Sequence, residues 1–126
     1  MNVILYAESA EKALEKLEKL IRAELPGLQV DRIDSIQSLS QKLCRPLNRI
    51  SVIVIFLVSE SGIAPLLTLK PLFDHIRLIL VLPDKTKRLT ALGLQLGPCF
   101  ISYWDNSLED ITAVLKKIDQ WTRDHH

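Results

Sequence analysis

Short apolar runs alternate with longer amphipathic stretches along the whole chain, and the alternation repeats five times. The apolar runs predict strands over residues 3–7, 28–34, 50–58, 76–82 and 99–104. The stretches between them predict helices over residues 8–25, 36–43, 61–73 and 86–96, with a fifth helix from about residue 107. One face of that last helix carries the apolar residues Leu108, Ile111, Leu115, Ile118 and Trp121.

The five runs also differ in how completely apolar they are. Those at 3–7, 50–58 and 76–82 are apolar almost throughout, as strands covered by helices on both faces must be, whereas 28–34 and 99–104 are mixed, as edge strands are. Strands that alternate with helices pair in parallel through right-handed crossovers. The pattern therefore predicts a three-layer α/β/α fold, (βα)5, with a five-stranded parallel sheet in the flavodoxin-like order 2-1-3-4-5.

Composition removes several classes of protein from consideration. The 126 residues suit a single domain over residues 1–126, and 16 basic against 15 acidic residues give no surplus for binding nucleic acid. No apolar run approaches the roughly 20 residues of a membrane span. The first run is too short for a signal peptide, so we expect a cytoplasmic protein without a membrane association.

The cysteines and histidines show no metal or redox spacing, so no metal and no cofactor is expected. Cys44 and Cys99 lie far apart in the chain. We expect them to be buried or partly buried free thiols rather than a disulfide.

One segment resembles a known family. Residues 91–110, ALGLQLGPCFISYWDNSLED, are similar to the closing segment of a response-regulator receiver domain, without a gap from Gly97 to Glu109. In receivers a helix end leads through the last strand into Lys-Pro-Phe-Ser-Leu-Glu-Glu and the final helix. Five βα units extend the resemblance, in pattern only, over the whole chain.

The resemblance implies a phosphorylation site whose residues this chain lacks. Receivers carry an acidic pair after the first strand that holds Mg²⁺, an acceptor aspartate ending the third, a hydroxyl after the fourth and a lysine in the fifth. The matching positions here hold Ala7, Glu8, Phe56, Pro83 and Trp104. Val58 and Ser59 are alternative matches for the acceptor, and neither is an aspartate. We therefore expect a degenerate pocket without aspartyl phosphorylation.

Four acids, Glu8, Glu60, Asp84 and Asp105, each follow a predicted strand, on the edge where such folds bind ligands. They could bind a divalent cation or transfer protons. The competing interpretation is that each stabilises the start of the next helix, where negative charge is favoured.

The strongest candidate for an interaction surface is the end of the fifth predicted strand. Tyr103 and Trp104 are residue types that dominate protein interfaces. By resemblance to receivers, which dock partners through their last two helices and last strand, the surface also includes Asp105 and Leu92. The alternative is that Trp104 fills the former phosphate pocket and Tyr103 packs on a neighbouring helix.

Two other segments each allow two interpretations. Residues 63–73 have few polar side chains, so this helix either packs completely or meets a second chain. Pro65 and Pro71 predict that it is irregular. The basic residues 85–88 suit a solvated helix start or a phosphate contact.

Together these patterns favour a non-enzymatic, phosphorylation-independent regulatory domain, a pseudo-receiver that binds a protein partner or forms a homodimer. The alternative is a sensor of a small ligand or nucleotide at the carboxyl edge of the sheet. A small enzyme of unrecognised type is a third hypothesis, which no motif in the chain requires.

Overall fold

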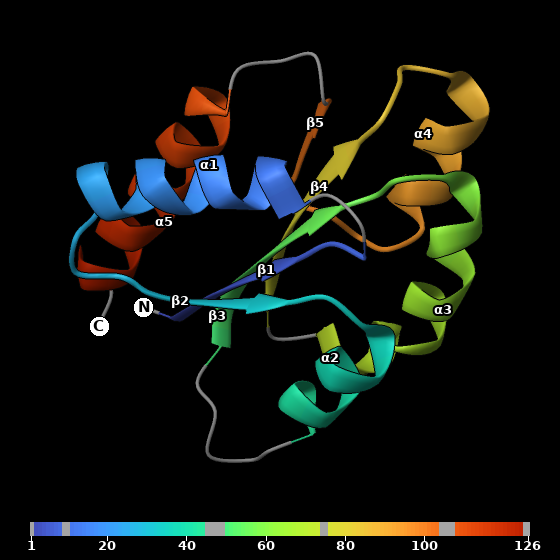
Figure 1. The fold of residues 1–126 in the computed structure, drawn as a ribbon, viewed down its shortest axis with the longest axis horizontal. Helices are drawn as coiled ribbons and strands as arrows, with labels where there is room; N and C mark the ends of the chain where they lie inside the picture. Colours follow the sequence, from blue (N-terminus) through green and yellow to red (C-terminus); the bar gives the residue numbers. More distant parts are fainter. Residues whose placement is uncertain (1, 9–10, 45–49, 74–75, 104–107, 125–126) are drawn as a thin grey trace.

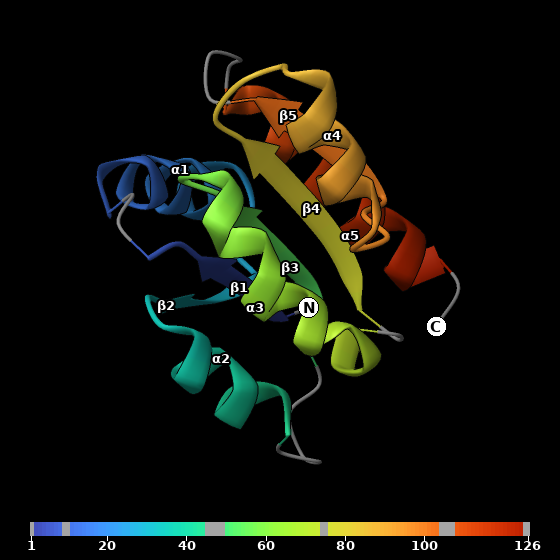
Figure 2. The ribbon, with the colours of Figure 1, turned by 90° about the vertical axis from the view of Figure 1, so that its right-hand side faces the viewer.

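The five predicted strands form one parallel sheet, which lies between two layers of helices (Figure 1). Figure 2 shows the sheet behind one of these helix layers. The computed structural model describes residues 2–8, 11–44, 50–73, 76–103 and 108–124. The strands are β1 (Asn2–Tyr6), β2 (Gln29–Ile33), β3 (Ile50–Phe56), β4 (Arg77–Leu82) and β5 (Phe100–Tyr103). The helices are α1 (Glu11–Glu24), α2 (Ile36–Leu43), η1 (Glu60–Gly62), α3 (Ile63–Thr68), η2 (Lys70–Phe73), α4 (Lys87–Leu94) and α5 (Glu109–Asp124).

The strand order is β2-β1-β3-β4-β5, and all four pairings are parallel, which confirms the predicted flavodoxin-like fold. The register aligns Tyr6 with Ile33 on one side and with Ile55 on the other. Helices α1 and α5 cover one face of the sheet, and α2, α3 and α4 cover the other (Figure 1). The helix of each βα unit therefore packs on one face of the sheet or the other. Because all the strands are parallel, their carboxyl ends lie along the same edge.

Alternation along the three inner strands builds a separate apolar core on each face. Leu5, Val54 and Val81 belong to the core under α1 and α5, whereas their neighbours in the same strands belong to the core under the other helices. In β4 every residue after Arg77 is buried. In β2 only Ile33 is buried, because this strand lies at the edge, as its mixed sequence predicts.

The segment after β3 is irregular, as its prolines predict. Pro65 lies in the first turn of α3, where its missing N–H costs nothing, and the helix ends at Thr68 before the short η2 turn. Ile63, Leu66 and Phe73 are buried against the sheet. Of the two interpretations of this apolar segment, packing is confirmed for these three side chains.

The two cysteines are free, as expected, but the prediction that they are buried is wrong. Cys44 follows α2, and Cys99 precedes the edge strand β5; both residues are exposed. Apolar character alone does not bury a side chain at the end of an element, because no second layer covers it there.

Among the described residues no helix is long and apolar enough to cross a membrane.

Candidate functional site

The carboxyl ends of the strands lie side by side along one edge of the sheet. Two backbone hydrogen bonds continue the ladder past the strand ends: Ala7 N–H donates to the Ile33 carbonyl (3.2 Å), and Leu57 N–H donates to the Val81 carbonyl (2.9 Å). This edge is where folds of this kind bind ligands, above all at the point where the strand order reverses. Here that point lies between β1 and β3, because α1 leads outward to β2 and α2 leads back to β3.

The space at this reversal point is almost filled. Its cavity measures about 20 Å³ and is lined by Tyr6, Glu8, Phe56, Leu57, Val58, Ser59 and Gly62. That volume holds roughly one water molecule. The Phe56 side chain is 2% exposed and belongs to the core under α1 and α5. Phe56 is the best match in sequence to the phosphate acceptor of receivers, and this match stays a prediction, as do the alternatives Val58 and Ser59.

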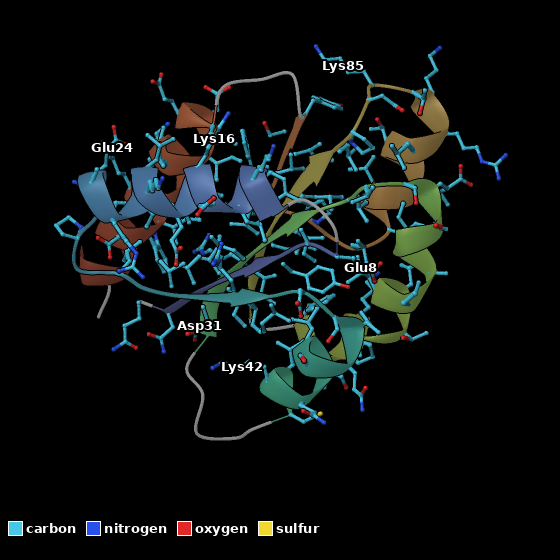
Figure 3. The ribbon with its side chains drawn as sticks, viewed as in Figure 1. Glu8, Lys16, Glu24, Asp31, Lys42 and Lys85 are labelled. Carbon is cyan, nitrogen blue, oxygen red and sulfur yellow. The ribbon has the colours of Figure 1, made fainter. Side chains whose placement is uncertain are left out.

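The remaining acid of the predicted pair is engaged by a tyrosine. The hydroxyl of buried Tyr6 donates to Oε1 of Glu8 at 3.0 Å, and Figure 3 shows Glu8 at the ends of the strands. Burial of the phenol, the hydrogen bond and the negative charge of Glu8 together raise the pKa of Tyr6 far above its ordinary value. The phenol therefore stays a neutral donor that holds the Glu8 carboxylate.

The other acids along this edge have different partners. Glu60, which opens η1, pairs through Oε1 with Nε and Nη2 of Arg88 on α4, both at 2.9 Å. Asp84 Oδ1 accepts from Thr86 N–H at 3.0 Å, and this hydrogen bond lowers the pKa of Asp84 below its usual range. Asp84 thus shapes the turn before α4, but the N-cap residue of α4 is Thr86, so the prediction that Asp84 caps this helix is wrong.

Within the described ranges no three His, Cys, Asp or Glu side chains are grouped to hold a metal ion. Asp105 lies outside the described residues, so its predicted role stays a prediction.

The described residues of the predicted degenerate pocket line three spaces along the edge of the sheet, two of which adjoin because Val58 and Ser59 line both. Glu8 and Phe56 line the small cavity at the reversal point. Pro83 lines a different cleft of about 480 Å³ between the loops after β3 and β4, which the Glu60–Arg88 pair bridges. Ala7 is buried and lines a third cavity, of about 430 Å³, beside α1. Trp104 lies outside the described residues, so its match to the receiver lysine stays a prediction.

The predicted interaction surface is described in part. Tyr103 and Leu92 are both half-buried and pack against the core under α2, α3 and α4. Lys85 Nζ lies 5.4 Å from the centre of the Tyr103 ring, close enough for a cation–π contact. Tyr103 thus packs on the α4 side of the sheet while part of it stays accessible. Trp104 and Asp105 fall outside the described ranges.

Two features were missed by sequence reasoning. Trp121 was predicted on the buried face of the last helix but is 51% exposed, and its ring lies 4.9 Å beneath the Arg77 guanidinium at the start of β4. The charged lining of the cavity beside α1, formed by Glu15, Arg32 and Asp34, was also missed. These three residues come from α1, β2 and the segment after β2, and no local spacing indicates that they meet.

Neither a protein-family model nor a curated protein matches the chain in sequence. Several solved structures do match in fold. A CheY-like response regulator receiver domain protein from Methanospirillum hungatei has a TM-score of 0.75 at 13% identity, over 98% of this chain and 97% of that one. The signal receiver domain of an HD domain-containing protein from Pseudomonas fluorescens has a TM-score of 0.76 at 14% identity, over 98% and 97%.

A third match comes from a protein of another description. A putative pilus assembly-related protein from Burkholderia pseudomallei has a TM-score of 0.71 at 16% identity, over 94% of this chain and 88% of that one. At these identities the likeness shows a receiver-like fold and does not assign a function.

Proposed function

We propose that this chain is a non-enzymatic regulatory domain with a receiver-like fold that acts through protein contacts and without aspartyl phosphorylation. The observation that carries the proposal is the burial of Phe56 and Ala7 at the positions where the receiver resemblance expects an acceptor and a metal-binding acid. The receiver-like neighbours are consistent with a signalling role.

The chemistry of phosphoryl transfer supports the same proposal. Transfer depends on positioning the phosphoryl group and on neutralising its charge with a metal ion and cationic side chains. Mg²⁺ prefers carboxylate oxygens and water as ligands. Among the residues that line the cavity beside Phe56, Glu8 is the one with a carboxylate, so this cavity does not hold the acidic pair that receivers use.

Addition of beryllofluoride and Mg²⁺ to the labelled protein tests this part of the proposal. We expect the amide NMR spectrum to stay unchanged, while an ordinary receiver in the same buffer shows its large response. Saturable, Mg²⁺-dependent shifts at the ends of β1, β3 and β4 would refute phosphorylation independence.

The partner surface we propose is the α4–β5 face around Tyr103, Leu92 and Lys85, extended by Trp104 and Asp105. A half-buried aromatic ring beside a cation provides apolar area with a polar rim, as interface anchors do. The near balance of charge favours a protein or a second copy of the chain over a nucleic acid, and the cytoplasm is the expected compartment.

Affinity capture from the native lysate tests this surface with a matched pair of variants. The Tyr103→Ala/Trp104→Ala double variant is compared with Leu72→Ala, which truncates an exposed apolar side chain on η2. We expect the wild type and Leu72→Ala to retain the same partner and the double variant to lose it, with all three folded by circular dichroism. Retention of the partner by the double variant would exclude this face.

Light scattering after size-exclusion chromatography measures directly whether the chain forms a homodimer.

A further inference from the structure

The cavity beside α1 combines an apolar floor with side chains of both charges. It measures about 430 Å³, within the usual size of small-molecule sites. Its lining consists of Ala7, Leu14, Glu15, Arg32, Ile33 and Asp34. Ala7, Leu14 and Ile33 are buried, whereas Glu15, Arg32 and Asp34 are exposed. The side chains of Ala7 and Leu14 belong to the core under α1 and α5, whereas the Ile33 side chain belongs to the core on the opposite face of the sheet. The charged groups therefore surround an apolar floor formed by Ala7 and Leu14.

The geometry of β2 directs Arg32 toward this cavity. Arg32 Nε lies 3.7 Å from Glu18 Oε2 on α1, so its side chain lies on the α1 side of the sheet. The preceding residue, Asp31, pairs instead with Lys42 of α2 at 3.1 Å, and Figure 3 shows this pair on the opposite side of β2. Since side chains alternate along a strand, the backbone of β2 separates the two charged pairs.

The charges of the cavity are only partly compensated within the described part of the chain. The Glu18 contact of Arg32 is long and involves Nε, although a guanidinium has five donors. Glu15 and Asp34 have no hydrogen-bond or ion-pair partner among the described side chains. A strand advances roughly 3.3 Å per residue, so the backbones at Arg32 and Asp34 lie roughly 7 Å apart, with opposite charges.

We propose that this cavity binds a small zwitterion, an α-amino acid with an aliphatic side chain. Its carboxylate pairs with Arg32, its ammonium group pairs with Asp34 and Glu15, and its side chain covers Ala7 and Leu14. In an α-amino acid the carboxylate and the ammonium group are bonded to the same carbon. One small molecule can therefore present both groups to Arg32 and Asp34. The proposal can hold whatever the answer to the phosphorylation question, because it shares only the buried Ala7 with that question and uses neither Phe56 nor the cavity at the reversal point.

Isothermal titration of the full chain with L-leucine tests the proposal, with two analogues as matched ligands. Leucinamide lacks the carboxylate, and isocaproate lacks the ammonium group. We expect saturable binding of leucine at millimolar affinity or better, and a loss of about tenfold or more for each analogue, because each leaves one charged contact unmade. No saturable heat with leucine would overturn the proposal, as would binding of leucinamide equal to that of leucine.

Three variants test whether leucine binds in this cavity. Arg32→Gln and Asp34→Asn are each expected to weaken leucine binding by about tenfold or more. Asp31→Asn is the matched control, because it removes one charge from the same strand on the opposite side, and it should bind as the wild type does. Equal weakening by Asp31→Asn, or unchanged binding by both cavity variants, would overturn the placement. The analogue series needs no substitution and stays decisive if a variant fails to fold.

Discussion

The hydrogen bond between Tyr6 and Glu8 predicts a stability that depends on alkaline pH. Replacing Tyr6 by Phe removes the hydroxyl but keeps the buried ring. Glu8 is exposed and regains water, so the loss near neutral pH should be that of one ordinary hydrogen bond, about 1 kcal/mol. Because the phenol is buried and faces a carboxylate, its pKa in the folded protein lies far above that of an unfolded tyrosine, about 10.

The sign of the effect follows from proton binding. Above about pH 10 the unfolded chain releases the Tyr6 proton while the folded chain keeps it, so the wild type loses stability as pH rises. At pH 11 this loss amounts to about 1.4 kcal/mol, and the variant does not suffer it. The variant, less stable by about 1 kcal/mol at neutral pH, should therefore equal or exceed the wild type near pH 11.

Urea unfolding followed by circular dichroism at several pH values between about 8 and 11 measures the difference. All other titrating groups are common to both proteins and cancel in the subtraction. Tyr103→Phe is the matched control, since it removes the only other tyrosine hydroxyl and leaves the Tyr6–Glu8 pair in place. A difference between wild type and Tyr6→Phe that stays constant with pH would refute the reasoning.

Two further predictions concern packing and the cleft at the sheet edge. Gly93→Ala places a Cβ 2.7 Å from Leu80 Cδ2 in the buried core, so overpacking of about 1–3 kcal/mol should exceed the gain of about 1 kcal/mol in helix propensity. Gly27→Ala meets nothing within 4 Å and should leave the melting temperature nearly unchanged, and an equal effect of both changes would contradict the packing argument. The exposed Glu60–Arg88 pair should couple by no more than about 1 kcal/mol in a double-mutant cycle, and the coupling should fall with added salt.

The order of elements and the layers of the fold were predictable from the sequence. Burial on both faces makes the inner strands β1, β3 and β4 continuously apolar, whereas edge strands tolerate polar side chains. The location of β3 was likewise predictable, although the strand ends at Phe56 and the apolar run continues to Val58. These properties depend on the local pattern of apolar and polar residues, which can be read from each segment without knowing what packs against it.

The grouping of side chains into sites was decided by the tertiary structure. Ala7 and Pro83 follow β1 and β4, and Phe56 is the last residue of β3, yet the three residues line different parts of the edge because the helices pack between them. The position of Trp121 depends on how α5 sits across the start of β4, which helical periodicity does not specify.

The meeting of Arg32 with Glu18 and the opposite placement of Asp31 beside Lys42 arise from pairing between elements distant in sequence. A linear pattern predicts which face of an element is buried, because burial follows the period of each element. It does not determine burial near the end of an element, as the exposed Cys44, Cys99 and Trp121 show. Which residues meet depends on the register and rotation of whole elements, and these are set only when the elements pack together.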